Sequence, residues 1–263
     1  MRNTITFILL FVFFTALLSF AKTQNDFSSL ILQGKEKLKQ AENTWQEADL
    51  LQARAFFERL ITAQPTEAWL VQYYLALADY RLTTFYFTIE AQDKAKAFLD
   101  DGIEQLQNCV TSKPDFAEAH SLLGALYGNK IAVNPFSAMV LGPKSGKEMA
   151  KALELEPNNP RTHLIAGWSA YFTPKMFGGG KDKAQQYFEQ AIAFFNSYQV
   201  TDPLLPNWGY EEAYTWLGML QMENGELEAA KTNFEKALQI NPDYSWVKND
   251  LMPNLQKKLA AKK

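Results

Sequence analysis

The sequence predicts an all-α fold, a right-handed solenoid of about five helix pairs that ends in a capping helix. A pattern of small and large apolar residues recurs roughly every 34 residues, and each unit holds two segments of helical periodicity around a turn. Hydrophobic residues make up 47% of the chain, which is ample material for a continuous core. The single cysteine, Cys109, allows no intramolecular disulfide, so side-chain packing must stabilise the fold.

The clearest repeat unit lies near the C-terminus, in residues 211–242, and reads EEAYTWLGMLQMENGELEAAKTNFEKALQINP. Its first half contains Leu217 and Gly218, where a second helix can approach closely, and Gly225 follows as a turn residue. Its second half alternates small and large residues at helical spacing and ends at a proline: Ala230, Phe234, Ala237 and Pro242. This unit therefore predicts two antiparallel helices that pack small side chains against large ones.

These spacings resemble the tetratricopeptide repeat, although Tyr214 stands where tryptophan is usual and Gln221 where tyrosine is usual. The chain resembles that superfamily over nearly all of residues 22–263, with the strongest match in the last three repeats. In outline it is similar to exported bacterial members, and loosely to the periplasmic tetratricopeptide component of TRAP-type transporters. The resemblance implies a scaffold for protein contacts, and it implies no substrate.

The repeat pattern divides residues 22–263 into units that form one domain. The predicted repeats cover residues 28–65, 68–114, 117–157, 160–199 and 211–242, and residues 243–261 form the cap. Each first helix from the second repeat onward carries a small residue at the close-packing position: Ala76, Gly124, Gly167 and Gly218. Three insertions, Thr83–Ala91, Asn129–Pro143 and Phe172–Gly180, fall between paired helices and are expected on one edge of the solenoid.

The first 21 residues have the order of a secretory signal. Arg2 precedes an apolar run from Ile5 to Phe20, and small residues at Ser19 and Ala21 fit a cleavage site. An uncleaved N-terminal anchor is the alternative. The segment predicts an exported protein, periplasmic or extracellular. The formal net charge is −3 and no basic stripe is present, which argues against nucleic-acid binding.

Neither catalysis nor a metal or cofactor site is predicted. FGGGKDKA, residues 177–184, resembles a phosphate loop, but Asp182 follows its lysine and a helical pattern precedes it, so the glycines are expected to turn a corner. His120 and His163 occupy equivalent positions on stacked helices, roughly 8–10 Å apart, which is too far for shared metal ligation. Cys109 takes a small buried position, and no paired base is identifiable.

First helices are expected to line the concave groove of such a solenoid. The candidate groove residues are Arg161, Leu164, Trp168, Tyr171, Phe172, Thr215, Met219 and Met222, and an insertion lip is expected from Met139, Met176 and Phe177. This groove is aromatic and rich in methionine, so an apolar peptide or a small apolar ligand should fit it. Alternatively, the loops that carry the lip fold back over their own repeats, and the groove is filled by the chain's own loops.

Two functional hypotheses follow. One is a non-enzymatic envelope scaffold that binds another protein through the groove and the edge carrying the insertions. The other is a periplasmic carrier of a small apolar ligand, or a transporter accessory protein.

Overall fold

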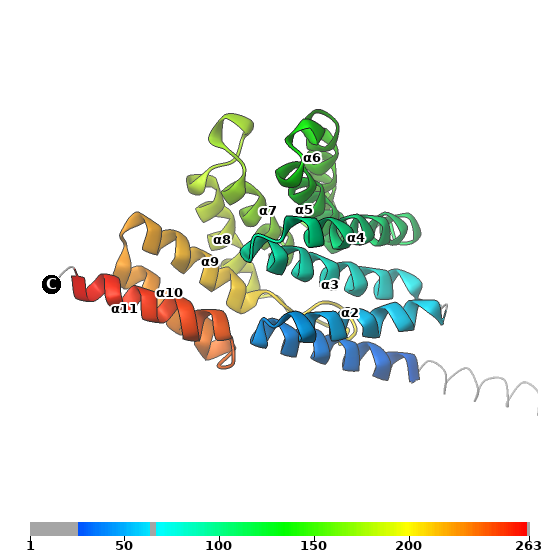
Figure 1. Cartoon of the computed structure of the whole chain (residues 1–263), viewed down its shortest axis with the longest axis horizontal. Helices are drawn as coiled ribbons and strands as arrows, with labels where there is room; N and C mark the ends of the chain where they lie inside the picture. Colours follow the sequence, from blue (N-terminus) through cyan, green and yellow to red (C-terminus); the bar gives the residue numbers. More distant parts are fainter. Residues whose placement is uncertain (1–25, 64–66, 262–263) are drawn as a thin grey trace, which may run out of the picture.

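The structure is a computed structural model that describes residues 26–63 and 67–261, and the predicted signal segment lies outside them. Within these ranges every regular element is a helix, and consecutive helices pair and stack (Figure 1). The predicted all-α solenoid of helix pairs is confirmed.

Five helix pairs and a cap make up the described chain. The first pair is the helix at residues 26–44 with α2 (Glu47–Thr62), and the second is α3 (Ala68–Thr88) with α4 (Gln92–Ser112). The next two are α5 (Ala117–Val133) with α6 (Ala138–Leu155) and α7 (Pro160–Phe172) with α8 (Lys181–Phe195). The last pair is α9 (Tyr210–Asn224) with α10 (Leu227–Ile240), and the cap consists of a π-helical turn, η3 (Trp246–Leu251), and α11 (Met252–Ala261).

Small residues set how closely paired helices approach. A Cβ atom added to Gly167 in α7 would lie 2.3 Å from Cε1 of Phe188 in α8. At Gly218 in α9 the same atom would lie 2.8 Å from Cε1 of Phe234 in α10. Both phenylalanines are fully buried, so the glycine and the ring of each pair fit together as the repeat pattern predicts.

The insertions differ from the expected loops at two of three places. In the first, α3 continues to Thr88 and α4 begins at Gln92, so no long loop projects. In the second, α5 runs to Val133, a 3-10 turn, η1 (Pro135–Ser137), follows, and α6 begins at Ala138. Met139 and its apolar neighbours therefore lie on a helix and not in a loop. Helix extension satisfies the backbone hydrogen bonds that a loop would expose.

The third insertion is a turn built on glycine. A 3-10 helix, η2 (Lys175–Phe177), is followed by Gly178 and Gly180, whose φ angles of +83° and +111° are ones that other residues rarely adopt. The N–H of Gly180 also donates to the carbonyl of Ala170, at 2.7 Å. The glycines thus turn the corner between α7 and α8, as predicted. This tip and the α5–α6 tip both project toward the top of Figure 1.

Candidate functional site on the concave face

The concave face is crossed by the segment between α8 and α9, residues 197–209, which we term the strap (Figure 1, yellow). Three consecutive strap carbonyls accept hydrogen bonds from first helices. The Lys35 ammonium donates to the carbonyls of Pro203, at 2.5 Å, and Leu205, at 2.6 Å. The Tyr74 hydroxyl donates to the carbonyl of Leu204, at 2.6 Å. The groove side chains therefore bind the main chain of a peptide segment, and that segment is the chain's own.

Lys35 has an unusual environment for a lysine. Burial, and then the nearby positive charge of Arg161, lower the pKa of its ammonium to about 8, although Asp202 and Glu118 act in the opposite direction. Among the described residues, its hydrogen bonds go to carbonyl oxygens and not to a carboxylate. Such a group holds the strap by donating hydrogen bonds rather than by forming an ion pair.

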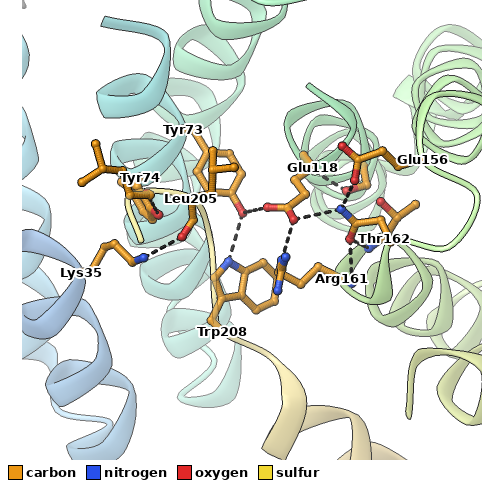
Figure 2. Close-up of polar contacts among 12 residues, drawn as sticks. Lys35, Tyr73, Tyr74, Glu118, Glu156, Arg161, Thr162, Leu205 and Trp208 are labelled. Carbon is orange, nitrogen blue, oxygen red and sulfur yellow. Dashed lines mark hydrogen bonds and ion pairs between the residues drawn. The ribbon is translucent and has the colours of Figure 1, made fainter. Parts of the chain in front are cut away.

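A buried polar cluster continues from the strap into the groove floor (Figure 2). The indole N–H of Trp208, in the strap, donates to the Tyr73 hydroxyl at 3.0 Å, and that hydroxyl donates to Glu118 at 3.4 Å. Arg161 Nε donates to Glu118 Oε1 at 2.6 Å, with both side chains at most 3% exposed. Burial raises the pKa of Glu118, and the charge of Arg161 opposes that rise. Buried charges need such partners, because an unpaired one costs several kcal/mol.

The Asn-Pro sequence that starts α7 positions this ion pair. The Asn159 side chain caps the helix by accepting from the backbone N–H groups of Arg161, at 2.9 Å, and Thr162, at 3.2 Å. Its amide nitrogen donates to Glu118 Oε1 at 3.0 Å. Pro160 at the first helical position has no N–H to satisfy. One cap residue therefore fixes the helix start and also orients the carboxylate that holds Arg161.

A second buried cluster joins the two ends of the solenoid. Arg81 in α3 donates to both carboxylate oxygens of Glu212 in α9, at 2.9 and 2.5 Å, and to Glu42 in the first helix, at 2.7 Å. Nearby, the Asn241 amide donates to Asn43 at 2.7 Å. Burial raises the pKa of Glu42 to about 7, against the effect of Arg81. Repeats one, two and five are thus in direct contact.

Aromatic rings fill the space between the two clusters. Trp168 stacks on Tyr80 with ring centroids 5.7 Å apart and on Trp208 of the strap at 6.1 Å. The Arg81 guanidinium lies over the Trp208 ring, 5.0 Å from its centroid, and over Trp168 at 5.8 Å. Trp168 is only 4% exposed, so this part of the face is packed and not open.

The structure buries most of the predicted groove residues. Arg161, Leu164, Trp168, Thr215 and Met222 are buried, Tyr171 and Met219 are half-buried, and Phe172 is exposed. Side chains covered by the strap reach a partner only if the strap moves, and their role in binding stays a prediction.

The lip residues, in contrast, are open to solvent. Met139, Met176 and Phe177 are 90%, 82% and 71% exposed. Phe136, Val140 and Phe172 are exposed beside them in the sequence, and we call these six side chains the apolar edge.

Sequence reasoning missed the residues that hold the strap. Lys35, Tyr74 and Trp208 were not among the groove candidates. The signal was a linker longer than a repeat turn that carries Leu204, Leu205 and Trp208, apolar side chains that a solvated loop seldom uses.

Residues with catalytic or metal-binding chemistry have structural partners. His120 faces Glu148 at 2.6 Å and the Pro114 carbonyl at 3.0 Å, and His163 faces Gln190 at 3.1 Å and the Pro157 carbonyl at 2.7 Å. Burial raises the pKa of the Cys109 thiol to about 12, which keeps it protonated and unreactive. Over residues 26–63 and 67–261, no group of three or more histidine, cysteine, aspartate or glutamate residues could hold a metal ion. In the same ranges no helix has the length and apolar character to cross a membrane.

Comparison with known proteins identifies the fold. Residues 211–244 match the family model of the tetratricopeptide repeat. A thermophilic tetratricopeptide-repeat protein of Thermus thermophilus is similar in structure, with a TM-score of 0.52 and 17% identity over 87% of this chain and 97% of that one. The haemophore HusA of Porphyromonas gingivalis is also similar, with a TM-score of 0.55 and 23% identity over 75% of this chain and 94% of that one. No curated protein matches the sequence.

Proposed function

We propose that this chain, which has the tetratricopeptide-repeat fold, is a non-enzymatic, protein-binding scaffold of the bacterial cell envelope. Solenoids of this kind generally present an extended concave surface to other proteins. The observation that carries the proposal is the strap, since it is a peptide segment bound in the groove through three consecutive main-chain carbonyls. A partner segment would use the same donors, Lys35 and Tyr74, after the strap has moved. The apolar edge is a second exposed surface of the molecule, distinct from the groove.

The envelope location rests on the sequence of residues 1–21, which has the order of an export signal. Cleavage after Ala21 would release a chain of 242 residues, because the full chain has 263. Intact-mass measurement on protein from the cell envelope tests this directly. A mass that includes residues 1–21 would instead indicate a chain anchored through that segment.

Site-specific photo-crosslinking in intact cells tests the scaffold proposal. A benzophenone amino acid would replace Asp202, which is exposed on the strap, or Phe177 on the apolar edge. The matched control position is Glu235, exposed on α10 away from both surfaces. We expect a discrete protein adduct from Asp202 and none from Glu235. Absence of an adduct at both Asp202 and Phe177, with normal protein levels, would reject the scaffold.

A second candidate is a carrier of a flat apolar ligand. HusA, which shares this fold, is a haemophore, and the apolar edge offers exposed phenylalanine and methionine side chains to such a ligand. Both ring nitrogens of His120 and of His163 already face oxygen acceptors. A haem would therefore be held at the edge by apolar contacts or methionine sulfur and not by these histidines. Haem titration followed by Soret absorbance decides between the candidates. Saturable one-to-one binding that Met139→Ser and Met176→Ser remove would favour the carrier.

A further inference from the structure

The apolar edge lies in a basic part of the chain. Residues 129–147 contain Lys130, Lys144 and Lys147 and no acidic residue, and residues 172–183 contain three lysines and one aspartate. These two tips together carry a formal charge of +5, in a chain whose net charge is −3, so all other residues sum to −8. This uneven distribution of charge orients the two tips toward an anionic surface and the net negative remainder of the chain away from it.

Several of these lysines are free to meet an external anion. Lys144 and Lys147 are exposed and make no ion pair with any residue that the structure describes. Lys183 donates only to the Gly178 carbonyl, at 2.9 Å, among the same residues. The other three have acidic partners: Lys130 binds Asp100, Lys175 binds Asp182, and Lys181 binds Glu223.

The side chains of the edge protrude from two tips of the fold. Phe136 is 95% exposed and Met139 is 90% exposed, beside the turn that joins α5 to α6, and Met176 and Phe177 occupy the α7–α8 turn. Both tips project in the same direction in Figure 1. Bulky apolar side chains on protruding tips suit a soft medium that closes around them, such as the boundary between lipid headgroups and acyl chains.

The positions of the lysines below the α5–α6 tip fit the lipid headgroup region. Val140, Lys144 and Lys147 follow one another at helical intervals of four and three residues, so they share one face of α6. At about 1.5 Å per residue, the lysines lie roughly 6 and 10 Å along the helix from Val140. Interfacial side chains reach about 5–10 Å into the headgroup region, so the ammonium groups would lie at the level of the lipid phosphates.

We propose that the apolar edge docks this protein on the surface of a bilayer that contains anionic phospholipid. The two tips insert their phenylalanine and methionine side chains, and Lys144, Lys147 and Lys183 bind headgroup phosphates. The strap and groove take no part in this contact. This surface contact is separate from the proposed binding of a protein in the groove, and either can fail without the other.

Vesicle co-sedimentation tests the proposal, using residues 22–263, which contain every described element of the fold. The probes are vesicles of phosphatidylcholine alone and of phosphatidylcholine with about one third phosphatidylglycerol. We expect binding to the anionic vesicles only, weakening with salt. Lys144→Gln with Lys147→Gln should weaken it about fivefold per lysine. The matched charge control is Lys231→Gln with Lys236→Gln, on exposed positions of α10, which should bind as the wild type does.

Insertion is measured at single positions, because Cys109 is buried and is the only native cysteine. A polarity-sensitive dye on Met139→Cys or Phe177→Cys should shift to the blue on anionic vesicles. The same dye on Ile89→Cys, at an exposed position in the α3–α4 turn, should not shift. Equal shifts at Met139 and Ile89 would overturn the proposal, as would equal binding to both vesicle types or binding to neither. Binding to neither would assign the edge to an acidic protein surface instead.

Discussion

Trp168 was predicted to line the binding groove, but its side chain packs in the core. Its ring is stacked between Tyr80 and the strap residue Trp208, and it is 4% exposed. Large-to-small changes at such positions typically cost about 3–5 kcal/mol of unfolding free energy. We therefore expect Trp168→Ala to lose that much in urea denaturation. A loss of less than about 1 kcal/mol would show an open groove and not a core.

A conservative variant separates the contribution of the Trp168 ring to stability from that of its N–H group. The indole nitrogen is buried without a hydrogen-bond partner among the described residues. Trp168→Phe keeps an aromatic ring and removes an unsatisfied donor, so it should cost much less than Trp168→Ala. Phe172→Ala, at a side chain that is 70% exposed, should leave stability nearly unchanged.

Two glycines test the close-packing rule within this one chain. Gly167→Ala places a methyl group 2.3 Å from the Phe188 ring, whereas Gly128→Ala in α5 meets nothing within 4 Å. Overpacking should make Gly167→Ala destabilising by about 1–3 kcal/mol. Gly128→Ala should instead stabilise by up to about 1 kcal/mol, because alanine is the better helix former. Thermal unfolding of both variants measures this, and the same sign for both would contradict the rule.

At the scale of the helices, the sequence predicts the helix pairs better than the segments that connect them. The small–large alternation at Gly167 and Phe188 is local, so a single chain reveals it. The path of the strap depends on contacts far apart in sequence, such as Tyr74 with Leu204, which no periodicity encodes. For the same reason, the sequence places the residues beneath the strap on first helices but does not show that the strap covers them. The exposed lip could be predicted, because apolar side chains next to glycine and proline have few local partners.

A pH-dependent contact joins the first two helix pairs. Arg54 in α2 donates to Asp79 in α3 at 2.5 Å, while the second oxygen of Asp79 is buried without a partner among the described residues. Burial raises the pKa of Asp79 to about 7, although Arg54 opposes that rise. The unfolded chain releases this proton near pH 4. Between about pH 4 and pH 7 the folded state therefore holds more protons, and its contribution to stability falls as the pH rises.

Replacing this carboxyl should remove that part of the pH dependence. We expect the free energy of unfolding of Asp79→Asn to fall less steeply from about pH 4 to pH 7 than that of the wild type. Urea titrations at several pH values give both slopes. Asp101→Asn, at the exposed carboxylate that also binds Arg54, serves as the control and should keep the wild-type slope. A slope in Asp79→Asn as steep as in the wild type would show that Asp79 is ionised throughout.

On the scale of the whole molecule, the two ends of the solenoid are fastened together. In an ordinary repeat array each unit contacts only its neighbours, and the end units open first. Here Arg81 of the second repeat binds Glu212 of the fifth, and Asn241 of the fifth binds Asn43 of the first. These contacts, together with the strap, cover much of the concave face. A partner that enters the groove must therefore disturb contacts between distant repeats.

Arg81 is the residue on which this closure should depend most. Removing one partner of a buried charge pair leaves the others uncompensated and typically costs about 3–5 kcal/mol. We expect Arg81→Met to lose that much stability and to raise amide hydrogen exchange in residues 26–44 and in α9, while α5 and α6 stay protected. A second variant, Arg81→Met with Glu42→Gln and Glu212→Gln, removes the orphaned carboxylates and should recover part of the stability but not the protection at the ends. If exchange in residues 26–44 stayed at the wild-type rate in both variants, packing alone would hold the ends together. The groove could then open without breaking this ion pair, and binding of a partner would depend on the strap alone.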